Sequence, residues 1–129
     1  MILLNQPVIG EEEIANVCSA LRETYISGIT GRFKEEFENR FSAYCGVQYG
    51  ISTNSGTTAL HLALAVLVIG PGDEVIIPTL TNIATAFAVI YCGATTVVVE
   101  SEPETFNIDV SQIESKITSR TKVIMPVHL

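Results

Sequence analysis

The stretch from Ile51 to Leu64, ISTNSGTTALHLAL, decides the fold of this chain. Around its start, Tyr49–Thr53 is aromatic and β-branched, which is typical of a strand. The cluster Asn54-Ser55-Gly56 is a turn signal. From Thr57 onward the chain is rich in Ala and Leu, which are strong helix formers. The sequence therefore predicts a short strand, a turn of small residues and an apolar helix.

The turn at Asn54-Ser55-Gly56 has two interpretations. Asn54 or Ser55 can be an ordinary N-cap for a core helix. Alternatively, the free N–H groups at the helix start and the positive end of the helix dipole can hold an anion, and small side chains let a phosphate come close. On the local sequence alone the cap is the simpler interpretation. A phosphate site needs support from the rest of the chain.

Downstream of this unit, strands and helices alternate. We expect strands at Glu74–Ile77, Thr95–Val99 and Thr121–Val127, with helices at Ile83–Tyr91 and Ser111–Ile117. Such alternation predicts an α/β domain with a mainly parallel sheet flanked by helices. Ligands bind beyond the carboxyl ends of strands in such sheets. Two polar loops, Asn54–Gly56 and Thr79–Asn82, lie at such ends, so we expect them to converge on one site.

Upstream, residues 1–46 read as a helical segment, and 47–129 as the start of the α/β domain. One amphipathic helix begins near Glu11, and a second spans Arg32 to Tyr44 and ends at Gly46. We interpret the aromatic stripe on the second helix as core packing; it consists of Phe33, Phe37 and Phe41. The loop Thr24–Gly31 is either a substrate contact or a plain linker. No helix follows the last strand, so the α/β domain reads as incomplete.

Composition narrows the function classes. The chain has 129 residues, a net charge of −7 and scattered basic residues, so nucleic acid is not an expected partner. Three cysteines without a Cys-x-x-Cys pair indicate buried free thiols in a reducing compartment. The start has no signal-peptide pattern, and the apolar run Ala59–Ile69 is too short to cross a bilayer. We therefore expect a soluble, cytoplasmic protein.

Common catalytic motifs are absent from the sequence. It has no P-loop, no Gly-x-Gly-x-x-Gly after a strand and no Gly-x-Ser-x-Gly. His61 and His128 do not form a metal pair by spacing, and we expect no metal site. His61 lies among Ala and Leu and is interpreted as a packed histidine. Glu100 and Glu102 follow a strand, where a solvated loop is the simpler interpretation than a carboxylate pair.

Several motifs occur together in a telling order: NSGTTALHLAL (54–64), GPGDEVIIPT (70–79), ATA (84–86), YCGA (91–94), FNID (106–109) and PVHL (126–129). In this combination the chain resembles the amino-terminal part of DegT/StrS-type sugar aminotransferases, which are pyridoxal-phosphate enzymes of the aspartate aminotransferase fold. The resemblance covers essentially the whole chain. It implies that these residues form part of the large domain of that fold, incomplete in this chain.

The resemblance also implies an activity. Such enzymes move an amino group from glutamate or glutamine to a keto sugar carried on a nucleotide, and they act as homodimers. By resemblance, the amides around Gly56 and Thr57 hold the phosphate of pyridoxal 5'-phosphate, with a hydroxyl from Ser55 or Thr57. Asn82 stands where the family usually places an aromatic ring against the cofactor, so a hydrogen bond to cofactor or substrate is expected in its place.

The family's Schiff-base lysine and the aspartate at the pyridine nitrogen are expected beyond Leu129. Lys34, Lys116 and Lys122 match neither position, so we expect no catalytic residue in this chain and no activity from it alone. A non-catalytic family member or remnant acting in binding or assembly, or an unrelated phosphate-binding α/β module, remain alternatives.

The resemblance also makes a prediction about the sheet. Val75–Ile77, Val97–Val99 and Val123–Met125 should form it, with Val75–Ile77 in the centre. In that fold Tyr49–Thr53 lies next to strands that come later in the sequence, so it should not pair with Val75–Ile77.

Overall fold

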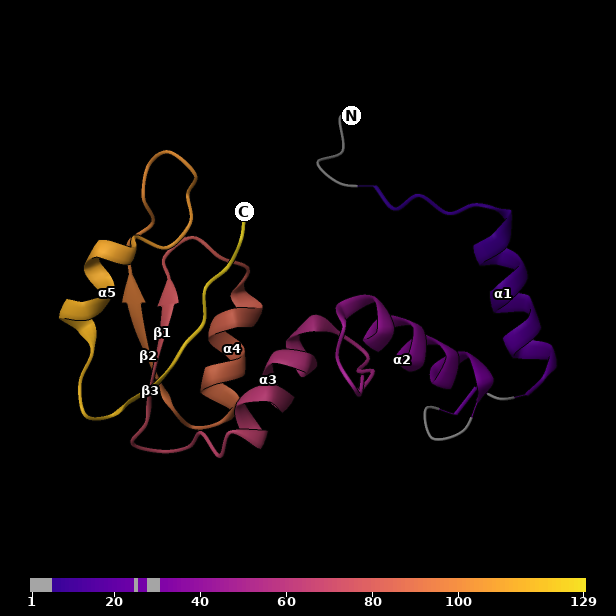
Figure 1. Ribbon diagram of the computed structural model, residues 1–129, viewed down its shortest axis with the longest axis horizontal. Helices are drawn as coiled ribbons and strands as arrows, with labels where there is room; N and C mark the ends of the chain where they lie inside the picture. The colour runs from indigo at the N-terminus through magenta and orange to yellow at the C-terminus, as the bar shows by residue number, and fades with distance from the viewer. Residues whose placement is uncertain (1–5, 25, 28–30) are drawn as a thin grey trace. The chain divides into compact units, whose positions relative to one another are not determined.

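A three-stranded parallel sheet forms the centre of the carboxy-terminal part of the chain (Figure 1). Strand β1 (Glu74–Pro78) lies in the middle, between β2 (Thr95–Val99) and β3 (Thr121–Ile124). Ile76 of β1 is in register with Val97 on one side and with Ile124 on the other. The predicted strand order, with 75–77 in the centre, is confirmed.

The computed structural model describes residues 6–24, 26–27 and 31–129. The chain divides into two units, Met1–Ser52 and Thr53–Leu129, which we describe separately. Half of the loop Thr24–Gly31, namely Tyr25 and 28–30, lies outside the described residues, so its expected role as substrate contact or linker stays open.

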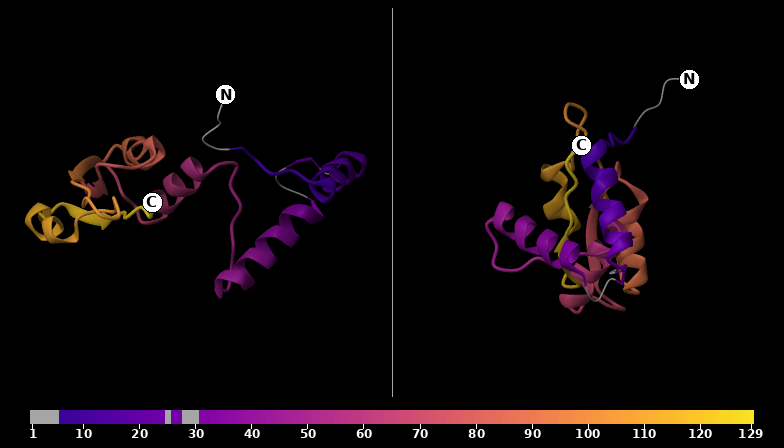
Figure 2. Two further views of the ribbon diagram at one scale, coloured as in Figure 1. Left: turned by 90° about the horizontal axis from the view of Figure 1, so that it is seen from above. Right: turned by 90° about the vertical axis from the view of Figure 1, so that its right-hand side faces the viewer.

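Helices cover both faces of the sheet in the second unit. Helices α3 (Gly56–Val66) and α4 (Ile83–Tyr91) lie on one face and α5 (Val110–Lys116) on the other (Figures 1 and 2). Because side chains of a strand alternate between faces, β1 divides its buried residues between two clusters. The α3–α4 face buries Val75, Ile77, Leu64, Ala88 and Val89. The α5 face buries Ile76, Val99 and Ile108.

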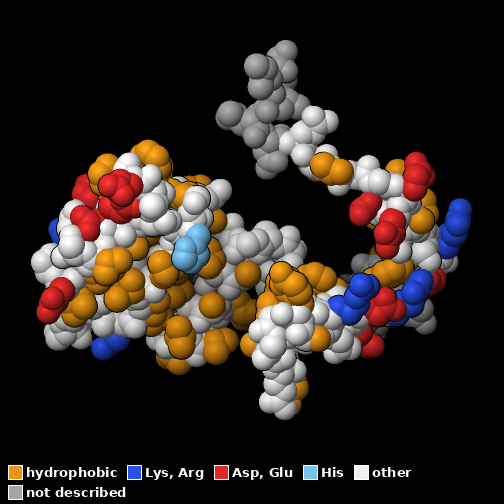
Figure 3. Space-filling view, turned by 45° about the horizontal axis from the view of Figure 1, so that its top comes forward, with side chains coloured by type: hydrophobic (Ala, Val, Ile, Leu, Met, Phe, Trp, Pro, Cys, Tyr) orange, Lys and Arg blue, Asp and Glu red, His pale blue; other side chains and the backbone are white. Residues whose placement is uncertain are grey.

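Many apolar side chains of this unit stay exposed, and Figure 3 shows hydrophobic side chains spread over its visible face. His61 is half-buried, and its ring meets the Tyr91 ring edge-on at 5.7 Å between centroids, as expected of a packed histidine. Among the helices of the described residues, none is long and apolar enough to cross a membrane.

The strand predicted at Tyr49–Thr53 is wrong: this segment has no strand structure. Its residues have strand propensity, and Tyr49 and Ile51 are each 77% exposed. A strand exists only when a neighbour completes its backbone hydrogen bonds. No such neighbour lies beside it within 31–129, and the N–H of Ser52 instead donates to the Glu38 carboxylate at 2.8 Å.

A buried carboxylate ties the start of β1 to the segment that leads into β3. Glu74 accepts a hydrogen bond from the Thr118 hydroxyl at 2.5 Å and one from Nε of Arg120 at 2.8 Å. The hydrogen bond from Thr118 has the larger effect and that from Arg120 the next, and both lower the pKa of Glu74, so the carboxylate stays charged. The register between β1 and β3 shifts directly after Glu74, so this anchor lies beside an irregularity in the ladder.

Helices α2 (Arg32–Cys45), α3 and α4 end in the same way. In each, a residue two or three positions past the end of the helix donates its N–H to a carbonyl five residues back, as in a Schellman motif: Val47 to Ser42, Ile69 to Leu64 and Ala94 to Val89. The residue before that donor has a positive φ. It is Gly46 after α2, where the sequence predicted a helix end, Gly93 after α4 and Val68 after α3.

Val68→Gly is expected to raise the free energy of unfolding by about 0.5–1 kcal/mol, because a left-handed backbone costs a β-branched residue about 1–2 kcal/mol. Val68 has φ 59° and is 84% exposed, so removing its side chain gives up little packing. Urea denaturation measures the change. Val66→Gly is the matched control, since Val66 is also exposed but is the last residue of α3, with helical backbone, where glycine should lower stability by about 0.5 kcal/mol or less. A loss of stability in Val68→Gly would contradict the prediction.

The first unit contains α1 (Glu11–Arg22) and α2, and both helices begin and end close to where the sequence predicted them. The core role expected for the aromatic stripe of α2 is wrong, because Phe37 and Phe41 are each 53% exposed. Their rings stack on each other at 5.5 Å between centroids. Spacing of four residues shows that the rings share one side of the helix, but it does not supply a surface to cover them.

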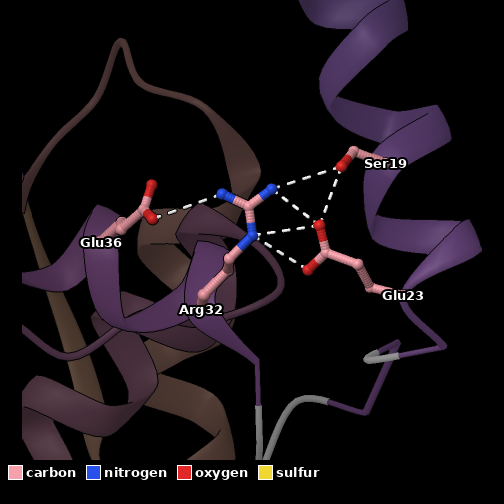
Figure 4. A network of polar contacts seen from close by, with 4 residues as sticks. All are labelled: Ser19, Glu23, Arg32 and Glu36. Atoms are coloured by element: carbon pink, nitrogen blue, oxygen red, sulfur yellow. Dashed lines mark hydrogen bonds and ion pairs between the residues drawn. The ribbon is translucent and has the colours of Figure 1, made fainter.

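An arginine links the two helices of the first unit (Figure 4). Arg32 of α2 donates from Nη2 to Glu23 Oε1 at 2.7 Å and from Nε to Glu23 Oε2 at 2.9 Å. Ser19 of α1 donates to Glu23 at 2.9 Å, and Glu36 lies 3.6 Å from Arg32 Nη1. The hydrogen bonds from Arg32 and then from Ser19 lower the pKa of Glu23 from 4.5 to about 2.

Arg32→Gln should therefore return the pKa of Glu23 toward its ordinary value. In the native protein, a lowered pKa means that the folded state binds fewer protons than the unfolded state, so this contribution to stability is present above pH 4.5 and is lost as pH falls toward about 2. Carboxyl-carbon NMR during an acid titration measures the pKa. Arg40→Gln removes an arginine of the same helix that makes no bond to Glu23, and it should leave that pKa in place.

The expectation that the cysteines are buried is also wrong. All three are free, but Cys45 is exposed and Cys18 and Cys92 are half-buried. Cys45 lies at the end of α2, where the chain turns at Gly46, and that end is open to solvent.

Candidate functional site

An open hollow of about 540 Å³ lies between the starts of α3 and α4. Gly56, Thr57, Ala59 and Leu60 line it from the first turns of α3, and Asn82, Ala84 and Thr85 line it from the start of α4. The two polar loops that the sequence predicted to converge thus contribute to one hollow. The amino termini of two helices meet there, and each carries a partial positive charge.

The start of α3 is fixed by its own side chains. Ser55 is the N-cap: its Oγ accepts from the N–H of Thr58 at 3.3 Å, and the Thr58 hydroxyl accepts from the N–H of Ser55 at 3.2 Å. The Ser55 carbonyl accepts from the N–H of Ala59 at 3.0 Å. Within the described part of the chain, these bonds leave the N–H groups of Gly56 and Thr57 without an acceptor. Two donors at the mouth of the helix are therefore free for a ligand.

Gly56 leaves this end of the hollow open. A Cβ added to Gly56 would meet no atom within 4 Å, so packing inside the chain does not require glycine there. A side chain would instead occupy space at the helix start, next to the two free N–H groups. Glycine at this position lets an anion approach the backbone closely.

Asn82 has a structural role as the N-cap of α4. Its Oδ1 accepts from the N–H of Ala84 at 3.0 Å, and its carbonyl accepts from the N–H of Thr85 at 3.0 Å. Because Oδ1 is used in this cap, the side-chain amide nitrogen is the part of Asn82 that can donate to a ligand.

The loop before Asn82 is held at both ends. The hydroxyl of Thr79 donates to the carbonyl of Val99 at 2.8 Å, which fixes the loop to the end of β2. At the other end, the hydroxyls of Thr81 and Thr85 lie 2.8 Å apart. The loop therefore presents Asn82 from a fixed backbone.

No ionisable side chain is among the seven residues that line the hollow. Its electrostatic character comes from the two helix amino termini and their uncompensated N–H groups. This arrangement suits an anion, and it provides neither a nucleophile nor a general base. Among the described residues there is also no cluster of three or more His, Cys, Asp or Glu that could hold a metal.

Of the four site residues predicted from the sequence, Gly56, Thr57 and Asn82 line the hollow. Ser55 does not line it but caps the helix beside it, so its hydroxyl is partly committed to Thr58. Sequence reasoning missed Thr85. The available signal was that Thr85 is the one polar residue of α4, IATAFAVIY, and stands three positions after Asn82.

The fold and the hollow together define an α/β protein in which the start of α3 offers free N–H groups beside an open hollow. The chain belongs to the DegT/DnrJ/EryC1/StrS aminotransferase family, whose model matches residues 7–129. The family resemblance predicted from the motifs is confirmed. Enzymes of this family depend on pyridoxal phosphate, and the fold is part of the type I fold of these enzymes, as expected from the sequence.

Two relatives and two solved structures illustrate the similarity. The chain is 54% identical over 123 residues to GDP-perosamine synthase of Caulobacter vibrioides, covering 95% of this chain and 33% of that protein. It is 43% identical to the spore coat polysaccharide biosynthesis protein SpsC of Bacillus subtilis, covering 95% of this chain and 31% of SpsC.

Among solved structures, the sugar aminotransferase Spr1654 of Streptococcus pneumoniae, in a form carrying pyridoxamine phosphate, matches with a TM-score of 0.86 and 42% identity over 97% of this chain and 31% of that one. An aminotransferase of Psychrobacter cryohalolentis matches with a TM-score of 0.90 and 36% identity over 95% of this chain and 31% of that one. The chain spans about a third of the length of the curated relatives it matches.

Proposed function

We propose that this chain forms the cofactor-phosphate side of a pyridoxal-phosphate-dependent aminotransferase that moves an amino group from glutamate or glutamine to a nucleotide-linked keto sugar. The observation that carries the proposal is the pair of free N–H groups at Gly56 and Thr57, which face an uncharged hollow in a chain of this family. The names of the relatives, including GDP-perosamine synthase, support the substrate class.

The residues of the hollow fit pyridoxal phosphate. Gly56 and Thr57 offer backbone donors to the phosphate, and the Thr57 hydroxyl adds another at the same end. Ser55 can keep its acceptor bond from Thr58 while it turns its hydroxyl hydrogen toward the phosphate. When bound, the cofactor supplies the electron sink for amino transfer, and this chain contributes binding and orientation.

Asn82 faces the hollow from the opposite side. We assign its amide nitrogen to an acceptor on the cofactor or the substrate, because Oδ1 already caps α4. A planar amide cannot provide the contact area of an aromatic ring. At this position, polar contact thus takes the place of stacking.

Amide NMR of the chain tests the phosphate role directly. Pyridoxamine 5'-phosphate is the suitable probe, since it lacks the aldehyde that would react with exposed lysines. It should shift the Gly56 and Thr57 amide signals in a saturable manner, whereas pyridoxamine without phosphate should not. Equal responses to both compounds, or no response at these two amides, would remove the basis for the assignment.

The amino donor and the sugar acceptor can be identified only by measuring the amino-transfer activity. When the whole protein is assayed, nitrogen-15 from the labelled α-amino group of glutamate or of glutamine should appear in the product sugar by mass spectrometry. Transfer from neither donor would favour a non-catalytic family member that acts in binding or assembly. The homodimer and the cytoplasmic location expected from the sequence remain predictions for the whole protein.

A further inference from the structure

Thr85 is a buried polar residue in the otherwise apolar helix α4. The helix exposes apolar residues such as Ile83 (62%) and Ile90 (55%), yet its one threonine is only 3% exposed. Burying a hydroxyl costs free energy unless it finds a hydrogen-bond partner. The position of Thr85 on the buried side therefore requires a specific partner.

That partner belongs to the loop that presents Asn82. The Thr85 hydroxyl lies 2.8 Å from the hydroxyl of Thr81, which in turn donates to the Asn82 carbonyl at 3.3 Å. A threonine inside a helix often bonds to the carbonyl four residues earlier. Thr85 instead contacts the side chain of the residue four positions earlier, which lies outside the helix. The hydrogen bond therefore runs from a buried helix position to the loop.

The direction of the hydrogen bonds follows from counting hydrogens. If Thr81 donates its one hydroxyl hydrogen to the Asn82 carbonyl, Thr85 must donate to Thr81. The same Asn82 carbonyl also accepts from the N–H of Thr85 at 3.0 Å. Thr85 thus holds the backbone of Asn82 both directly and through Thr81.

We propose that Thr85 is a positioning residue of the hollow, whose buried hydroxyl acts through Thr81 to hold Asn82 in the place from which its amide meets the ligand. This proposal rests on the function proposed above and adds a residue to it. Thr85 also lines the hollow next to Ala84 and Asn82, so the residue that holds Asn82 belongs to the wall of the same hollow. Its role is to fix the α4 side, while the phosphate is held on the α3 side.

The test compares Thr85→Val, which removes the hydroxyl at nearly constant shape, with Thr85→Ser, which keeps it. Thr85→Val should weaken binding of pyridoxamine 5'-phosphate by about three- to tenfold, the loss of one hydrogen bond. It should leave the response of Gly56 to inorganic phosphate unchanged. Thr85→Ser should restore the affinity. Thr81→Val removes the same bond from the loop side and should reproduce the effect without altering the buried position.

A second readout needs no ligand. Hydrogen exchange of the Ala84 N–H reports whether Asn82 Oδ1 still caps α4, and it should quicken in Thr85→Val and Thr81→Val but not in Thr85→Ser. Native exchange and native affinity in Thr85→Val would overturn the proposal. So would a Thr85→Ser variant as impaired as Thr85→Val, which would point to packing by the methyl group. Failure of the proposed function is distinguishable, since the native chain would then not respond to pyridoxamine 5'-phosphate at Gly56.

Discussion

Gly56→Asp should weaken binding of pyridoxamine 5'-phosphate by about a hundredfold while leaving the fold intact. A carboxylate at this position would occupy the open space beside the free N–H groups of Gly56 and Thr57, where we place the phosphate. Two like charges about 4 Å apart near a protein surface repel each other by several kcal/mol. The same carboxylate is favourable at the first turn of a helix. Stability should therefore hold or rise as binding falls.

Two variants control for this result. Ala63→Asp adds the same charge to an exposed position of α3 outside the hollow and should leave the affinity nearly unchanged. Gly56→Ala introduces a side chain without charge and should give a loss of affinity between those of the other two variants. Calorimetric titration supplies the affinities, and thermal unfolding supplies the stabilities. Native affinity in Gly56→Asp would show that the phosphate does not bind at the start of α3.

Ile76→Ala should lower the free energy of unfolding of the second unit by about 3 kcal/mol. Ile76 is fully buried in the central strand and packs with Val99 and Ile108 on the α5 face. Truncation removes apolar contacts and leaves a cavity whose walls cannot close completely, because β1 is held by a strand on each side. Chemical denaturation monitored by circular dichroism measures the loss.

Ile124→Ala is the matched control. Ile124 pairs directly with Ile76 across the β1–β3 ladder, but its side chain is 43% exposed. Removing the same atoms there should cost about 1 kcal/mol or less, because much of the side chain remains in contact with water in the native state. Equal losses at the two positions would contradict the assignment of Ile76 to the core.

The sequence predicted those elements whose signals are local. The helix at Ile83–Tyr91 and the strand at Thr95–Val99 were predicted to the residue, because periodicity and the adjacent turn residues define them. The central position of 75–77 came from family resemblance and not from propensity. The strand predicted at Tyr49–Thr53 was wrong because its signal is only compositional. A strand also needs a neighbouring strand, and the local sequence does not specify one.

The candidate site was predictable to a similar extent. Gly56, Thr57 and Asn82 could be found from turn chemistry and motif order, and all three line one hollow. Thr85 was missed: its polarity within an apolar helix marks it as unusual, but the sequence gives no sign of which way its hydroxyl points. The commitment of Ser55 and Asn82 to helix caps likewise depends on backbone geometry at each helix start.

The hydrogen bonds of Glu74 with Thr118 and Arg120 affect the order in which the strands pair as the chain is synthesised. Glu74 pairs with Thr95 on one side and with Thr121 on the other, so β2 becomes available to β1 well before β3 does. Until then, the backbone N–H and C=O groups on the second edge of β1 are unpaired, and a strand of another chain could pair with them. A carboxylate at the start of that edge disfavours such an addition. Once Thr118 and Arg120 are synthesised, Thr118 donates a hydrogen bond to this carboxylate and Arg120 forms an ion pair with it, so that β3 can pair with β1.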